Sequence, residues 1–173
     1  MYVNKQERLR EDGVVGEPIL FYRTADPYGY FSNFSKHEIY LVDPWTGKLR
    51  KYATGEHRFQ AMKAINRKDH GFVCKAYSCS DSKKRGRIIT LRDDWGSCYS
   101  SISWFVMLEI CIAKAMRHND VMDELERTNS HHIYEDSPVD PIWGWRYNNN
   151  YNGANLLGRA WMEARSIIFA DGR

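Results

Sequence analysis

Three side chains suited to sugar chemistry follow one another at helical spacing in the first half of the chain. Glu56, Gln60 and Lys63 stand at positions i, i+4 and i+7 of the segment GEHRFQAMK. With about 3.6 residues per turn, such positions share one face of a helix. A carboxylate stabilises positive charge that develops on a ribose ring, and a nearby amine can donate a proton, bind phosphate or form an imine. Spacing alone, however, favours the solvated polar stripe of an amphipathic helix.

The reactivity of Glu56 and Lys63 depends on their surroundings. Glu56 falls in the first turn of the predicted helix, where the helix dipole favours the ionised carboxylate. Imine formation requires a neutral amine; burial lowers the pKa of a lysine, whereas a neighbouring carboxylate raises it. The sequence leaves open which of these two effects dominates at Lys63.

Two further segments carry groups suited to a nucleotide. In the segment FSNF, residues 31–34, aromatic residues flank Ser32 and Asn33. The Asn33 amide can bind a base edge or a ribose hydroxyl, although such a residue alone is more often a turn former. The basic stretch 83–87 and Arg92 offer guanidinium groups whose geometry matches phosphate oxygens. A solvated helix face explains the basic stretch about equally well.

Two later segments combine rigid backbone with polar groups. Residues 135–145 hold acidic side chains, two prolines and two tryptophans, which predict a rigid loop. Such loops often carry function, but a structural loop pinned by its tryptophans has the same composition. Residues 153–158 lead into the last predicted helix, with Asn155 as its N-cap. Free backbone amides at that helix start can bind an anion.

The bulk composition limits the class of protein. A chain of 173 residues with 43% hydrophobic and 27% charged residues fits one globular domain with one core. The net charge of +3 is too small to require a nucleic-acid partner, but it is compatible with a site for one or two phosphates. No metal-ligand motif, Walker loop or nucleophile elbow is present, so we expect no metal and no cofactor.

The cysteines and the apolar runs indicate where in the cell the protein is expected. Cys74, Cys79, Cys98 and Cys111 form no C-x-x-C pair, and free thiols are typical of a reducing cytosol. No apolar run approaches the ~20 residues needed to cross a bilayer, and the polar start is unlike a secretory signal. We therefore expect a cytoplasmic protein without a membrane partner.

Periodicity and turn residues predict an α+β fold with a few early strands followed by a helical majority. The expected strands are 18–23, 37–42 and 49–53, with a hairpin turn at 43–47. The expected helices are 54–66 with Thr54 as N-cap, 83–88 capped by Ser80 or Ser82, 101–117, 120–125 and 155–169. Residues 1–16 are expected to form a flexible arm, and residues 17–173 a single catalytic domain.

Taken in order, these segments resemble the NADAR family, the YbiA-like proteins. The resemblance spans roughly residues 20–168, and its specificity comes from several short motifs in the right order. The matching residues are Phe31, Ser32, Asn33, Phe34, Glu56, His57, Phe59, Gln60, Ala61, Lys63, Gly86, Arg87, Arg92, Asp94, Trp95, Asp140, Trp143, Gly144, Gly153, Asn155, Leu157, Gly158, Met162 and Arg165.

The resemblance implies an α+β domain that hydrolyses the bond between ribose C1′ and a base nitrogen. Two activities are associated with such proteins: removal of ADP-ribose from guanine in DNA or RNA, and breakdown of phosphoribosylamino intermediates of riboflavin synthesis. It assigns catalysis to Glu56, Lys63 and Asp140, with Lys63 forming a Schiff base. It assigns substrate binding to Asn33, Phe34, Gln60, Arg87, Arg92, Trp95, Trp143 and Asn155.

Several departures from the family pattern and one rival hypothesis accompany this assignment. Among the departures, Arg58 stands where the family usually has an aromatic residue, which is compatible with a more anionic substrate or with a surface charge. The rival is a non-catalytic module that binds ADP-ribose or a nucleotide. A module that only binds its ligand does not need an amine beside a carboxylate, so the combination of Glu56, Lys63 and Asp140 favours an enzyme.

Overall fold

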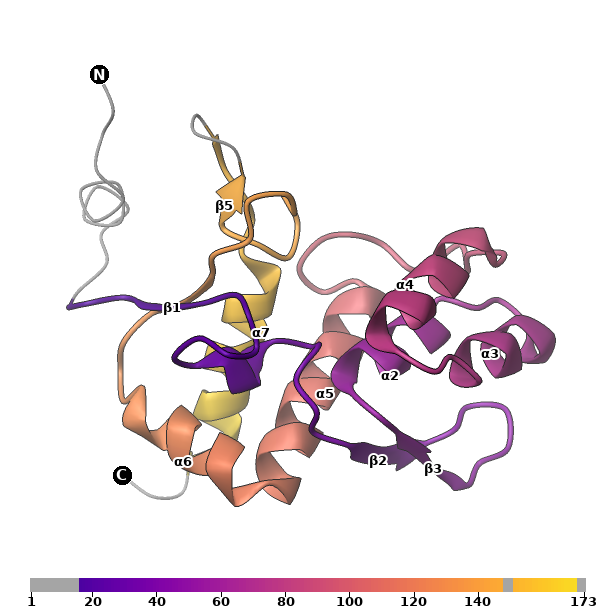
Figure 1. Ribbon diagram of the computed structural model, residues 1–173, viewed down its shortest axis with the longest axis horizontal. Helices are drawn as coiled ribbons and strands as arrows, with labels where there is room; N and C mark the ends of the chain where they lie inside the picture. Colours follow the sequence, from indigo (N-terminus) through magenta and orange to yellow (C-terminus); the bar gives the residue numbers. More distant parts are fainter. Residues whose placement is uncertain (1–15, 148–150, 171–173) are drawn as a thin grey trace.

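The computed structural model describes residues 16–147 and 151–170. A long apolar helix, α5 (Ile102–Arg117), runs through the middle of the molecule (Figure 1). The Ser101 hydroxyl caps it by accepting the Trp104 backbone N–H at 3.4 Å. Trp104, Met107 and Cys111 are buried along its length. The predicted helix 101–117 is therefore confirmed.

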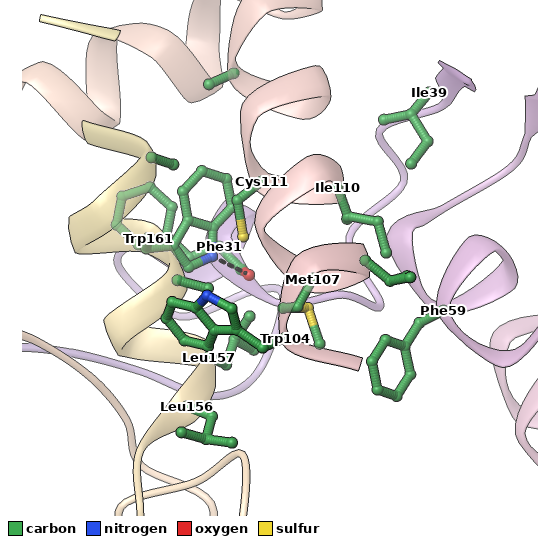
Figure 2. Packing of buried hydrophobic residues seen from close by; sticks show 14 of the residues in the cluster. Phe31, Ile39, Phe59, Trp104, Met107, Ile110, Cys111, Leu156, Leu157 and Trp161 are labelled. Carbon is green, nitrogen blue, oxygen red and sulfur yellow. Dashed lines mark hydrogen bonds between the residues drawn. The ribbon is translucent and has the colours of Figure 1, made fainter. Parts of the chain in front are cut away.

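The last helix, α7 (Leu156–Ile168), packs along one side of α5 (Figure 1). Trp161 is fully buried between them, and its indole N–H donates to the Phe31 carbonyl at 2.9 Å, as Figure 2 shows. Phe31 ends a 3-10 turn, η1 (Gly29–Phe31), that leads into the loop containing Asn33. The core thus fixes the position of that loop.

Three short helices gather on the other side of α5 (Figure 1). They are α2 (Gly55–Ala61), α3 (Arg67–Cys74) and α4 (Cys79–Ile88). The predicted helix 54–66 is wrong in length, because the chain tightens into a turn after Ala61. The turn is held by segment 90–92, whose Arg92 N–H donates to the Lys63 carbonyl at 2.9 Å. Ala64 also forms an isolated bridge with Leu91.

The N-cap residues of the two neighbouring helices explain where each helix begins. Asn66 caps α3, which the sequence did not predict, by accepting the Asp69 N–H at 2.9 Å. Ser78 caps α4 by accepting the Asp81 N–H at 3.1 Å, so this helix starts earlier than the predicted Ser80 or Ser82 cap. The remaining helix, α6 (Asn119–Arg127), covers the predicted 120–125.

Within residues 16–147 and 151–170, the strands form three small pairs. β2 (Ile39–Val42) and β3 (Leu49–Tyr52) form the predicted antiparallel hairpin. Asp43 closes its turn by accepting the Trp45 N–H at 2.9 Å. β5 (Arg146–Tyr147) pairs with β6 (Tyr151–Asn152).

The third pair joins distant parts of the chain. β1 (Ile19–Phe21) runs parallel to β4 (Ile133–Glu135), a strand that the sequence did not predict. The α+β class with a helical majority is confirmed. Apart from Gly16, the predicted arm 1–16 lies outside the described residues. No helix in the described ranges is long and apolar enough to span a bilayer.

Candidate active site

A cavity of about 150 Å³ opens where α2, α4, the 32–34 loop and the segment after β4 meet. Seven residues from the predicted set line it, and they come from three separate parts of the chain. They are Asn33, Phe34, Glu56, Gln60, Lys63, Asp140 and Trp143. The cavity therefore brings together all three of the predicted catalytic residues.

Glu56 lines the cavity and is buried. Its backbone N–H donates to the Asn33 carbonyl at 3.0 Å, which ties α2 to the 32–34 loop. Its Oε1 accepts the Gln60 amide N–H at 2.8 Å. Burial raises the pKa of Glu56, while Gln60, Lys83 and Lys63 favour its ionised form. The direction is opposite to the one expected from the helix dipole, because the carboxyl is desolvated.

Lys63 reaches the cavity from the turn after α2 rather than from the helix itself. Its N–H donates to the Gln60 carbonyl at 3.3 Å, a tight i to i+3 contact that keeps the residue on the Glu56 side. Its Nζ lies 5.4 Å from the centre of the Phe59 ring. Burial lowers the pKa of Lys63, and it outweighs Glu56, which raises that pKa. Desolvation therefore dominates the competition that the sequence left open.

The basic helix α4 contributes a second amine. Lys83 lines the cavity and places its Nζ 5.9 Å from the centre of the Phe34 ring. The positive charges of Lys83 and Arg87 both lower the pKa of Lys63, so both lie within electrostatic reach of it. The sequence grouped Lys83 with the basic stretch but did not assign it to the site.

Aromatic side chains form the wall of the cavity on the side of residues 135–145. Trp143 lines the cavity and meets the Phe59 ring edge-on, with centroids 5.0 Å apart. Asp140 positions it, because the Asp140 Oδ1 accepts the backbone N–H of Trp143 at 2.9 Å. Trp95 also packs against Phe59, with ring centroids 5.1 Å apart, and is buried. It is not among the residues that line the cavity.

The Asn33 side chain is held on one side only. Its Nδ2 contacts the Met107 sulfur at 3.2 Å, whereas its Oδ1 is buried without a hydrogen-bond partner among the described residues. The Gln60 Oε1 is likewise buried and unpartnered. Both residues line the cavity, so a hydroxyl group of a bound substrate can supply the hydrogen bond that these oxygens lack.

Glu135, at the end of β4, is a cavity residue that sequence reasoning missed. Its backbone N–H donates to the Asn155 Oδ1 at 3.0 Å, and the Asn155 Nδ2 donates to the Ile133 carbonyl at 2.9 Å. Asn155 therefore uses its amide to hold β4. Asn155 is the N-cap residue of α7, as predicted, with left-handed backbone angles (φ 53°, ψ 38°), but its side chain makes no cap bond to the helix.

Two arginines that the sequence singled out lie elsewhere. Arg92 binds Asp94 through two hydrogen bonds and lines a different cavity, of about 440 Å³, beside Trp45 and Met62. Arg58 is buried and donates to the Tyr52 hydroxyl, the Val42 carbonyl and Glu109. Arg58 is therefore a structural residue that joins α2 to the hairpin and to α5, and not a surface charge.

No described group of three or more His, Cys, Asp or Glu side chains has an arrangement that could hold a metal ion. The cavity instead combines three carboxyl groups (Glu56, Glu135 and Asp140) with the amines of Lys63 and Lys83. Such a set can donate and accept protons, stabilise positive charge and provide a nucleophile.

Comparison with known proteins identifies the fold and its class of chemistry. The NADAR domain model matches residues 20–169. A Nostoc punctiforme protein named as an N-glycosidase is 34% identical over 155 residues, covering 87% of this chain and 92% of that protein. A Zea mays protein named as the chloroplastic riboflavin biosynthesis protein PYRR is 30% identical over 162 residues, covering 87% of this chain but 25% of that protein.

A solved structure has a similar fold. The NMR structure of the E. coli protein YbiA superposes with a TM-score of 0.74 at 29% identity, covering 91% of this chain and 89% of that chain. The match over nearly the whole chain, together with the cavity, leads to one conclusion. The chain belongs to the NADAR family of N-glycosidase-type hydrolases.

Proposed function

We propose that this protein removes ADP-ribose from guanine in nucleic acid by cleaving the bond between ribose C1′ and the base nitrogen. The observation that carries the proposal is the cavity in which the Glu56 carboxyl, the Lys63 amine and Asp140 converge. A module that only binds ADP-ribose gains nothing from a half-buried amine whose pKa is lowered. A covalent mechanism requires that amine.

The proposed reaction begins with attack on C1′. The neutral Nζ of Lys63 adds to C1′, and Glu56 takes the proton that the amine loses. The bond from C1′ to the base nitrogen breaks, its electron pair stays on that nitrogen, and the nitrogen takes up a proton. The ribose ring then opens: Glu56 passes its proton to the ring oxygen, and Nζ and C1′ form a protonated imine. Water adds to the imine and releases the sugar as an aldehyde, which restores the lysine. Asp140 orients a ribose hydroxyl near C1′.

The size of the cavity supports a substrate that extends beyond it. About 150 Å³ is well below the ~300–1,000 Å³ of pockets that enclose a drug-sized ligand. A ribose ring fits such a space, whereas a base and a diphosphate must lie outside it. In the proposal, Trp143 stacks the base, and Lys83 and Arg87 on α4 bind the phosphates; Trp143 and Lys83 line the cavity, and Arg87 lies within electrostatic reach of Lys63. A base within a nucleic-acid strand is compatible with this partial enclosure.

A second substrate has its own support. The maize relative is named as a riboflavin biosynthesis protein, which favours a phosphoribosylamino precursor of riboflavin as the alternative. This molecule also joins ribose C1′ to a nitrogen, so the same residues serve both reactions. It carries one phosphate rather than two, and it needs no contact with a nucleic-acid strand.

The test is a direct comparison of the two substrates. The purified protein is incubated with an ADP-ribosylated guanosine oligonucleotide and, separately, with the riboflavin precursor, and the products are identified by mass spectrometry. The proposal predicts unmodified oligonucleotide and free ADP-ribose. Cleavage of the precursor alone supports the alternative. Binding of ADP-ribose without turnover of either substrate supports the non-catalytic module.

A further inference from the structure

Glu135 occupies the cavity as a carboxyl group that the mechanism above does not use. It ends β4, so its backbone is fixed by the parallel pairing of Phe21 with Glu135 and by the bond to Asn155. Its Oε2 is buried and has no hydrogen-bond partner among the described residues. A carboxylate oxygen left without a partner in a dry site is costly, and the neutral acid avoids that cost.

The charged groups around Glu135 come from three elements. Glu56 on α2 and Asp140 on the following loop repel a negative charge on Glu135, and Lys83 on α4 attracts it. Lys63 lines the same cavity from the turn after α2. Burial, followed by the charges of Asp140 and Glu56, raises the pKa of Glu135 to about 8.

Glu56 and Glu135 therefore have different environments within one cavity. Glu56 accepts a hydrogen bond from Gln60 and has both Lys63 and Lys83 favouring its charged form. Glu135 has an unpartnered oxygen and is close to the charges of Asp140 and Glu56. Burial raises the pKa of both carboxyl groups, but only Glu56 has a hydrogen-bond donor recorded on its carboxyl group and two amines that favour its charge. Two carboxyl groups in such different surroundings are suited to opposite roles, one as base and one as acid.

We propose that Glu135 is the general acid that protonates the departing base nitrogen. This inference rests on the proposed function. As the bond from C1′ to nitrogen breaks, the proton on the Glu135 carboxyl passes to that nitrogen, and Glu135 becomes a carboxylate. At the same time the proton lost by the attacking Lys63 amine passes to Glu56. The number of charges in the cavity is unchanged, and water restores the Glu135 acid in the hydrolytic half of the reaction.

The first part of the test measures protonation without any substrate. Carbon-13 NMR of protein labelled at glutamate side chains follows each carboxyl through a pH titration. We expect one glutamate to titrate near pH 8 in the wild type and to be missing in Glu135→Gln. Glu124→Gln is the matched control, because the Glu124 Oε2 on α6 is also buried but lies outside the cavity. Titration of Glu135 below pH 5 would overturn the proposal.

The second part measures release of guanine-containing product from the ADP-ribosylated oligonucleotide. General acids commonly contribute about 10²–10⁴ in rate, so Glu135→Gln should lose that much in kcat while Glu124→Gln keeps the wild-type rate. The alkaline fall of kcat/KM near pH 8 should be present in the wild type and absent from the residual activity of Glu135→Gln. Glu135→Asp, which keeps the acid, should retain that fall.

The outcomes separate this inference from the proposed function. A wild-type protein that cleaves neither the oligonucleotide nor the riboflavin precursor contradicts the proposed function. A folded Glu135→Gln that is as fast as the wild type on a substrate that the wild type cleaves contradicts only the role of Glu135. If Glu135→Gln does not fold, the wild-type titration and the pH profile of Glu135→Asp still decide the question.

Discussion

Gly86 on α4 packs directly against the side chain of Gln60 on α2. A Cβ added at Gly86 would lie 2.1 Å from the Gln60 Oε1 and 3.0 Å from its Cβ and Cδ. Only glycine permits this approach, which keeps the Gln60 amide pointed at Glu56. The close crossing of the two helices is thus part of what positions the site.

Gly86→Ala should therefore reduce activity through Gln60. The added methyl displaces the amide and weakens its hydrogen bond to Glu56, and overpacking of this kind costs about 1–3 kcal/mol of stability. Gly71→Ala is the matched control, because a Cβ at Gly71 on α3 meets nothing within 4 Å. That change should stabilise the protein by about 0.4–1 kcal/mol. Chemical denaturation and steady-state kinetics of both variants check this, and equal kinetics would contradict it.

Removal of the Glu56 charge should slow the chemical step. Glu56→Gln keeps the shape of the side chain but loses the carboxylate, and removal of one electrostatic stabiliser of this kind costs about 10²–10³ in kcat. Glu163→Gln, on the exposed side of α7, should keep the wild-type rate. Circular dichroism verifies folding. A folded Glu56→Gln with near-wild-type turnover on a confirmed substrate would remove Glu56 from the mechanism.

The two arginines assigned to phosphate should behave differently. Arg87 lies within electrostatic reach of Lys63, so Arg87→Ala should raise KM more than it lowers kcat. Arg92 is bound to Asp94 beside the other cavity, so Arg92→Ala should leave KM unchanged. Initial rates over a range of substrate concentration measure both. A larger KM effect at Arg92 would show that the substrate extends to the second cavity.

The raised pKa of Glu135 also predicts a dependence of stability on pH. The folded protein holds a proton on Glu135 up to about pH 8, whereas the unfolded chain releases it near the ordinary value of 4.5. Between these values the folded state binds more protons, so this group makes the protein less stable as pH rises. Glu135→Gln removes the effect, and its stability relative to the wild type should increase from pH 4.5 to 8. Urea denaturation at several pH values tests this, and a constant difference would contradict it.

Helical spacing predicted the neighbours of Glu56 better than it predicted the helix. The i, i+4, i+7 pattern places Gln60 and Lys63 on the Glu56 side, and all three line the cavity. The helix nevertheless ends at Ala61, because contacts with segment 90–92 replace its last turn. The spacing of residues within one helix contains no information on contacts with a backbone segment almost thirty residues further along the chain.

Other site residues were beyond the reach of sequence reasoning for related reasons. β4 is three residues long, too short for any periodicity, so nothing indicated that Glu135 ends a strand facing the cavity. Trp95 and Arg92 match the family motif, but a motif does not say which way a side chain points. In the structure, Trp95 packs against Phe59 without lining the cavity, and Arg92 is bound to Asp94.

The most direct test of the central claim is a covalent trap at Lys63. Borohydride added during turnover of the ADP-ribosylated oligonucleotide should reduce the imine and leave a ribosyl adduct, which peptide mass spectrometry will locate on Lys63. Lys63→Arg should abolish both the adduct and most activity, because a guanidinium keeps the charge but cannot form the imine. Lys84→Arg, an exposed neighbour on α4, should still be trapped. Normal turnover without an adduct, together with an active Lys63→Arg variant, would contradict the account and leave Glu56-assisted attack by water in its place.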